Sequence, residues 1–110
     1  MKSVTVDLVV TGDESAAAAA AVDAVRRGQR VLVVLRAGDS RAVPRARRLC
    51  RGARGQLIVI AQAEVVCVDG VHHVEAVVIR HGRTGRLTAV NASAFLSCDR
   101  STTSTGSGSV

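Results

Sequence analysis

Aromatic side chains are almost missing from this sequence of 110 residues, which has one phenylalanine, Phe95, and neither tryptophan nor tyrosine. Base stacking on exposed rings is therefore excluded as a mode of nucleic-acid binding, since Phe95 lies in an apolar run. The core must be built from valine, leucine, isoleucine and alanine, whose small side chains let helices pack closely on a sheet. The length fits one domain, which is short for an enzyme that holds both a cofactor and a substrate.

Cysteines are few and widely spaced, and long apolar segments are missing. Cys50, Cys67 and Cys98 form neither a CxxC redox pair nor a paired zinc knuckle. Cys67 lies in an apolar run and is predicted to be a small core residue, and Cys98 is a minor candidate for a catalytic thiol. Asp7 interrupts the apolar stretch after Lys2, so no secretory signal or membrane span is predicted. We expect a soluble, cytoplasmic protein with reduced thiols.

Lysine is also nearly missing, because Lys2 is the only lysine among 15 basic residues, and the formal net charge is +6. This excess favours an anionic partner, either a phosphate-bearing cofactor or an acidic protein surface, and the alternative is a solvated arginine-rich surface. No recognised nucleic-acid motif accompanies the basic stretch, so nucleic acid is not the expected partner. The arginines weighed as a nucleic-acid surface are Arg41, Arg45 and Arg48, which would share one helix face, together with Arg51 and Arg54.

The apolar pattern predicts an α/β domain over residues 1–99 and a disordered low-complexity tail over 100–110. Strands of a parallel sheet are predicted at Val4–Val10, Arg30–Leu35 and Gln56–Ile60, and helices at Glu14–Arg27 and Val43–Cys50. An antiparallel meander is predicted at Glu64–Val68, His73–Arg80 and Arg86–Asn91, followed by a last strand at Ala92–Ser97. Asp13 is expected to cap the first helix and Gly28 to end it.

The turn Gly12–Ala17, the segment Leu35–Ala42 with Arg36 and Arg41, and the hairpin Glu64–Val77 form a pattern over most of the chain. This pattern resembles the NAD(P)H-binding domain of flavoprotein disulfide reductases, most closely the thioredoxin reductase branch. The FAD-binding domain of the same superfamily is a related candidate, because it shares the opening strand, helix and strand. That domain normally ends its second strand with an acid, where this chain has Leu35 followed by Arg36.

The resemblance implies a three-layer Rossmann-like fold, with helices on one face of a small parallel sheet and a three-stranded antiparallel meander on the other. It also implies a dinucleotide site in which Gly12 and the backbone of Ser15 and Ala16 line the pyrophosphate path. Arg36 and Arg41 would then clamp the 2′-phosphate of NADP. NADP is favoured over NAD because no acid ends the second strand, and FAD is the less expected ligand.

The turn departs from the family's G-x-G-x-x-A pattern. Thr11 stands at the first glycine, and Asp13 stands at the second, where bare backbone normally approaches the pyrophosphate. A carboxylate at Asp13 would repel a diphosphate by about 4 kcal/mol at ~4 Å and an effective dielectric constant of roughly 20. Asp13 would also satisfy the helix amides itself, so a degenerate site and a working site of altered geometry both remain open.

No catalytic residue and no metal site are predicted. The sequence has no CxxC, nucleophile elbow or paired carboxylates, and His72 and His73 beside Asp69 are expected to be solvated turn residues. The expected function is a stand-alone NAD(P)- or FAD-type nucleotide-binding module related to flavin-dependent oxidoreductases, acting as a subunit or a non-catalytic remnant. The alternative is a structural or interaction protein with a blocked nucleotide site, which forms a homo-oligomer or packs on a partner oxidoreductase subunit.

Overall fold

The computed structural model describes residues 4–36, 41–70 and 74–98. In chain order the elements are β1 (Val4–Gly12), α1 (Glu14–Arg26), β2 (Arg30–Val34), α2 (Ala42–Leu49), β3 (Gln56–Ile60), β4 (Ala63–Asp69), β5 (Ala76–His81) and β6 (Leu87–Cys98). The predicted tail at 100–110 and the pair His72 and His73 lie outside the described residues.

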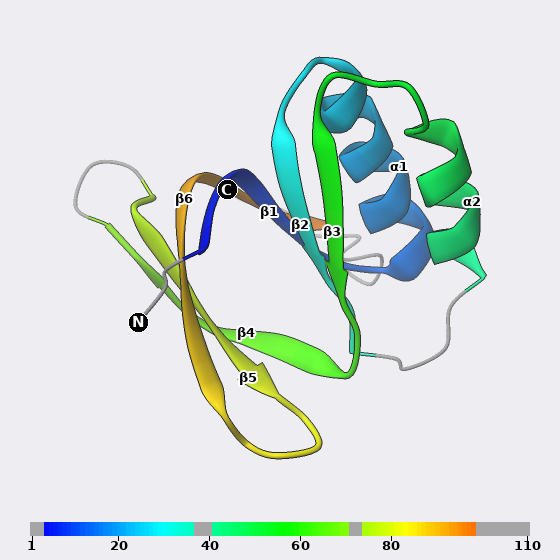
Figure 1. The fold of residues 1–110 in the computed structure, drawn as a ribbon. Helices are drawn as coiled ribbons and strands as arrows, with labels where there is room; N and C mark the ends of the chain where they lie inside the picture. The colour runs from blue at the N-terminus through cyan, green and yellow to red at the C-terminus, as the bar shows by residue number, and fades with distance from the viewer. Residues whose placement is uncertain (1–3, 37–40, 71–73, 99–110) are drawn as a thin grey trace, which may run out of the picture.

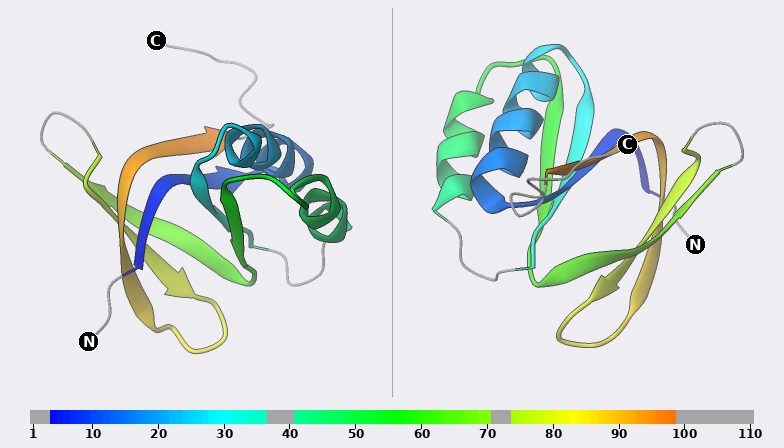
Figure 2. Two further views of the ribbon diagram at one scale, coloured as in Figure 1. Left: turned by 45° about the horizontal axis from the view of Figure 1, so that its top comes forward. Right: turned by 180° about the vertical axis from the view of Figure 1, so that it is seen from behind.

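The strands form a six-stranded sheet in the order β3-β2-β1-β6-β5-β4. Strands β3, β2, β1 and β6 pair in parallel, whereas β5 and β4 pair antiparallel to their neighbours. Figure 1 shows α1 and α2 on one side of the parallel strands, with β4, β5 and the first half of β6 folded over the other side. Figure 2 shows the same three layers from two further directions. The predicted α/β architecture is therefore confirmed.

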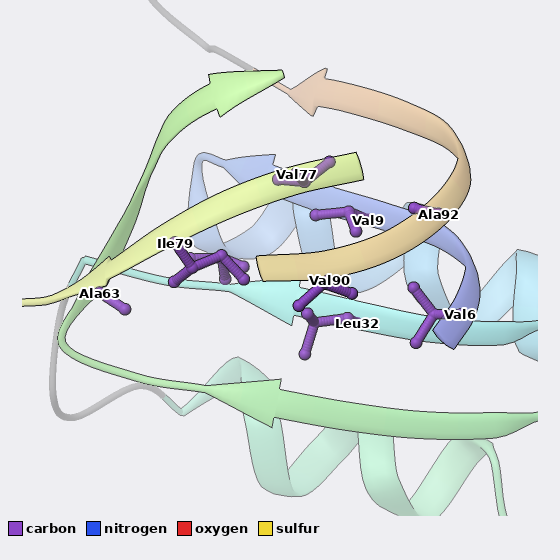
Figure 3. Close-up of a cluster of buried hydrophobic side chains, with 9 residues drawn as sticks. Val6, Val9, Leu32, Ala63, Val77, Ile79, Val90 and Ala92 are labelled. Atoms are coloured by element: carbon purple, nitrogen blue, oxygen red, sulfur yellow. The ribbon is translucent and has the colours of Figure 1, made fainter. Parts of the chain in front are cut away.

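Two buried clusters lie on opposite sides of the parallel strands. The cluster between these strands and the meander is drawn in Figure 3 and contains Val6, Val9, Leu32, Val34, Ala63, Val77, Ile79, Val90 and Ala92. The cluster beneath the helices contains Val10, Ala17, Ala21, Ala24, Val25, Val31, Val33 and Leu35. Successive side chains of a strand point to opposite faces, and both faces are covered here. This is why β2 is a continuous apolar run rather than an alternating one.

Helix α1 packs closely on the sheet because its inward side is mostly alanine. As predicted, Asp13 caps the helix, with its side chain accepting a hydrogen bond from the amide of Ala16 at 3.1 Å. Gly28 follows the last turn with a φ of +94°, which is a conformation that favours glycine. Among the described residues, no helix has both the length and the apolar character needed to cross a membrane.

Strand β6 corrects the prediction of two separate strands at Arg86–Asn91 and Ala92–Ser97. It is one strand whose residues up to Asn91 pair with β5, while the residues from Val90 onward pair with β1. No glycine or proline occurs between Leu87 and Cys98, so nothing in the backbone chemistry ends the strand where its neighbour changes. The meander and the parallel sheet therefore share one continuous strand.

The prediction that Cys67 is a core residue is wrong, because Cys67 is exposed. Strict alternation along β4 would place Cys67 on the same side as Val65, which packs against the cluster in Figure 3. The pairing of β4 with β5 is irregular between these two residues, and Cys67 instead lies opposite Val78. The irregularity therefore turns Cys67 to the outer side of the meander.

Candidate functional site

Strands β1, β2 and β6 end level with one another at one edge of the sheet. The register pairs Thr11 with Val34 of β2, and it pairs Gly12 with Cys98 of β6. The chain leaves β1 through α1 toward β2 on one side, while β6 lies on the other side of β1. Ligands of open α/β sheets bind at this kind of position, outside the carboxyl ends of strands that lead in opposite directions.

Gly12 is held against the backbone of Cys98. Its φ is +119°, and a Cβ atom at this position would lie 2.5 Å from the carbonyl carbon and 2.8 Å from the amide nitrogen of Cys98. The next residue, Asp13, donates its backbone N–H to the carbonyl oxygen of Cys98 at 2.7 Å. Strand β6 therefore requires a glycine at position 12 whether or not a ligand binds there.

Asp13 lies between the end of β1 and the start of α1, where it is the N-cap of the helix. One of its oxygens accepts the Ala16 amide hydrogen at 3.1 Å, and its backbone carbonyl accepts the Ala17 amide hydrogen at 2.8 Å. Free amides at a helix start are the groups that bind phosphate in dinucleotide sites. The carboxylate thus holds one of the amides that an anionic ligand would use, while Ser15 and Ala16 themselves are exposed.

Arg36 follows β2 and is exposed. Its positive charge acts on Glu64, the second residue of β4, which also bonds to Arg80 across the hairpin. The hydrogen bond and the charge of Arg80 lower the pKa of Glu64 below its ordinary value, and the charge of Arg36 adds a smaller effect in the same direction. An anion bound by Arg36 would therefore compete with the carboxylate of Glu64 for the positive charge of this arginine.

Arg41 stands at the start of α2 and lines a groove between α1 and α2 together with Ser15. The structure therefore brings these two predicted residues to one surface. Arg36 does not line this groove. The predicted clamp of Arg36 and Arg41 stays a prediction, because residues 37–40 between them lie outside the described residues.

Cys98 is half-buried beside the turn. Burial raises the pKa of its thiol, and the negative charge of Asp13 raises this pKa further. Both effects favour the neutral thiol, which is a poor nucleophile. Among the described residues, no group of three or more His, Cys, Asp or Glu side chains could hold a metal ion.

Two features of this region were missed by sequence reasoning. The pairing of Glu64 with Arg80 follows from the hairpin register and was recognisable once the turn between β4 and β5 was assigned. The groove between α1 and α2 was also missed: the spacing of Arg41 and Arg45 predicted that they share a helix face, but not that this face lines a groove beside α1.

Several solved structures are similar to this chain over most of its length. The thioredoxin reductase from Streptococcus pyogenes is similar with a TM-score of 0.70 and 21% identity, over 86% of this chain and 31% of that chain. The thioredoxin reductase from Giardia duodenalis is similar with a TM-score of 0.72 and 20% identity, over 88% and 31%. The flavin-dependent monooxygenase PieE is similar with a TM-score of 0.70 and 14% identity, over 90% and 31%.

The chain has a Rossmann-like α/β fold. It spans about a third of the length of these structures, and identities this low establish the fold alone. The sequence matches no protein-family model and no curated protein. The Rossmann-like fold places the turn after β1 where dinucleotide-binding domains hold their phosphates.

We expect Gly12→Ala to lower the free energy of unfolding by about 3 kcal/mol in urea titrations. A left-handed alanine is strained by about 1–2 kcal/mol, and the clash with β6 adds roughly 1–3 kcal/mol. Gly52→Ala is the matched control, because Gly52 has a φ of +81° but no atom within 4 Å of an added Cβ. Equal losses for the two variants would show that β6 does not constrain position 12.

We expect iodoacetamide at pH 8 to alkylate exposed Cys67 faster than Cys98 or Cys50, whose thiol pKa values are both raised by burial. Asp13→Asn keeps a helix-capping side chain but removes the charge. This variant should lower the pKa of Cys98 and speed its alkylation, because a lower pKa raises the thiolate fraction at pH 8. Peptide mass mapping measures each site. Cys50 is the internal control, and an unchanged rate at Cys98 would contradict the electrostatic coupling.

Proposed function

We propose that this chain is a dinucleotide-binding module related to flavin-dependent oxidoreductases, which works as a subunit of a larger assembly or as a non-catalytic remnant. The observation that carries the proposal is the shared location of the turn Gly12–Ser15 and Arg36 at the carboxyl edge of adjacent parallel strands. This edge is where the fold binds nucleotides in general. The proposal includes a cytoplasmic location, where three unpaired cysteines would stay reduced.

NADP is the proposed ligand. Exposed Arg36 and Arg41 offer planar donors for a terminal phosphate, and β2 is followed by Leu35 and Arg36 rather than by an acid that would bind a ribose hydroxyl. FAD is the next candidate, because the similar structure of the monooxygenase PieE is a complex with FAD. The module alone offers no hydride acceptor, so turnover would need a flavin on a partner chain.

A second function, a structural or interaction protein with a blocked nucleotide site, is favoured by Asp13. Its carboxylate already accepts the Ala16 amide, and its backbone N–H is bonded to Cys98. The carboxylate of Asp13 lies at the helix N-terminus, where an oxygen of a bound phosphate would otherwise lie, and it is part of the protein itself. In this function the module contributes its surface, in a homo-oligomer or on a partner oxidoreductase subunit.

Thermal unfolding with and without millimolar NADP, NAD, FAD and ADP-ribose separates the two functions. A ligand that binds only the native state stabilises it by about 2.7 kcal/mol at 100 times its Kd, which raises Tm by roughly 10 °C in a domain of this size. Asp13→Ser keeps a capping oxygen without the charge, and we expect it to bind NADP at least about tenfold more tightly than the parent. Binding by Asp13→Ser alone would identify a blocked site. No shift in either protein would overturn the nucleotide proposal.

We expect Arg36→Ala and Arg41→Ala each to weaken NADP binding about tenfold and to leave NAD binding within about twofold, because a charged hydrogen bond contributes about 1.5–3 kcal/mol. Isothermal titration of the Asp13→Ser background measures both affinities. Arg83→Ala is the matched control, since Arg83 is exposed in the turn between β5 and β6. Equal losses for NADP and NAD would show that these arginines do not recognise the 2′-phosphate.

A further inference from the structure

Helices α1 and α2 lie side by side on the face of the sheet away from the meander (Figure 1), and an open groove of about 520 Å³ runs between them. The residues that α1 contributes are Ser15, Ala18, Ala19 and Val22. The residues that α2 contributes, after Arg41, are Ala42, Arg45, Ala46 and Leu49. Both sets have the spacing i, i+3, i+4, i+7, so each helix turns one continuous face to the groove over about two turns, or roughly 10 Å.

The surface of this groove is largely apolar and open to water. Leu49 is 51% exposed and belongs to neither buried cluster of the domain. Ala18 is half-buried and Ala19 is exposed on the opposite wall. The fold therefore does not need Leu49 for its own core, and covering this side chain would remove apolar surface from water.

The α2 side of the groove is strongly basic. Residues 41–63 contain six arginines and no acidic residue. The ion pairs among the described residues join Arg27 to Asp23 and Arg80 to Glu64, so neither of them neutralises α2. Arg41 and Arg45 lie on the groove itself, beside the apolar surface. A partner that fits must therefore carry carboxylates next to apolar side chains.

We propose that this groove binds an acidic amphipathic helix of another protein. A trough between two helices accepts the side-chain ridge of a third helix, with apolar residues at i, i+3 or i+4, and i+7 seated along it. Leucines of the bound helix pack on Leu49 and the alanines of α1. Glutamates beside them pair with Arg45 and Arg41, and the planar guanidinium groups fix their orientation.

Other occupants fit this surface less well. Nucleic acid would use the arginines but leave Leu49 in water, and no aromatic residue lies in the groove for bases to stack on. A second copy of this chain has no acidic amphipathic helix among its described residues, because α2 is basic and α1 carries only Glu14 and Asp23. Residues 101–110 contain neither an acid nor a leucine, so this segment does not supply the helix either.

The test uses a fluorescein-labelled synthetic helix built of leucine, alanine and glutamate, with leucines at i, i+4 and i+7 and glutamates flanking them. Two control probes accompany it: a peptide of the same composition with its leucines scattered round the helix, and a single-stranded oligonucleotide of equal net charge. Fluorescence anisotropy with the full chain at ~150 mM salt keeps long-range charge attraction screened. We expect the amphipathic peptide to bind at least about tenfold more tightly than either control probe.

Variants locate the binding to the groove. We expect Arg45→Glu to weaken the amphipathic peptide at least about tenfold and Leu49→Ser about fivefold. Arg83→Glu makes the same change in net charge at an exposed turn, and Leu87→Ser removes a leucine that is 62% exposed on the meander. Both control variants should bind within about twofold of the parent. Circular dichroism confirms that all four variants keep the fold.

Three results would overturn the proposal. The first is no binding of the amphipathic peptide at 1 mM, which corresponds to a binding free energy of about −4 kcal/mol. The others are equal binding of the scattered peptide or the oligonucleotide, and undiminished binding of the amphipathic peptide by Leu49→Ser. Preferred binding of the oligonucleotide would assign the arginines to nucleic acid instead. Arg41 and Ser15 belong both to this groove and to the proposed NADP site, whereas Arg45 and Leu49 belong to the groove alone. The Arg45 and Leu49 variants therefore test helix binding separately from nucleotide binding. If Arg45→Glu and Leu49→Ser bind NADP as the parent does, a failure of helix binding is distinguished from a failure of nucleotide binding.

Discussion

The backbone contact between Gly12 and Cys98 joins the two halves of this molecule. Strand β6 leaves the meander, bends, and finishes alongside β1, where its last residue bonds to the Asp13 amide. Only a residue without a side chain allows this approach at a φ of +119°. The contact fixes the turn at the start of α1, next to Cys98, which packs on the cluster beneath the helices. The turn of the candidate site and the end of β6 thus depend on the same glycine.

The turn also explains why the same residues support two functions. A phosphate site needs unoccupied amides at a helix start, and helix stability needs those amides satisfied. Asp13 meets the second need with its own oxygen, at 3.1 Å from the Ala16 amide nitrogen. Burial raises the pKa of the neighbouring Cys98 thiol, and the negative charge of Asp13 raises this pKa further. The side chain that caps α1 is therefore the same one that opposes a bound diphosphate.

The sequence predicted those parts of the fold that depend on local pattern. The apolar runs of β1, β2 and β3, the cap at Asp13 and the end of α1 at Gly28 all follow from the chain near each residue. The continuity of β6 and the outward position of Cys67 depend instead on which strand lies beside each segment. In the candidate site, the turn and its acid were predictable, and the contact with β6 was not, since its partners are far apart in the sequence. The alanines of α1 predicted a stable helix, but they did not indicate that one face of this helix lines a groove.

The pairing of β1 with β6 has a consequence for how the chain folds. Val4 lies beside Val90, so residues at positions 4 and 90 must meet before the sheet is complete. Closing so long a loop is entropically costly and slows folding relative to local pairing. The unit of β1, α1 and β2 can assemble early, but the edge of β1 that pairs with β6 stays unpaired until almost the whole domain has left the ribosome. Until β6 arrives, that valine-rich edge is open to pairing with neighbouring chains, which is the situation in which incomplete sheets aggregate.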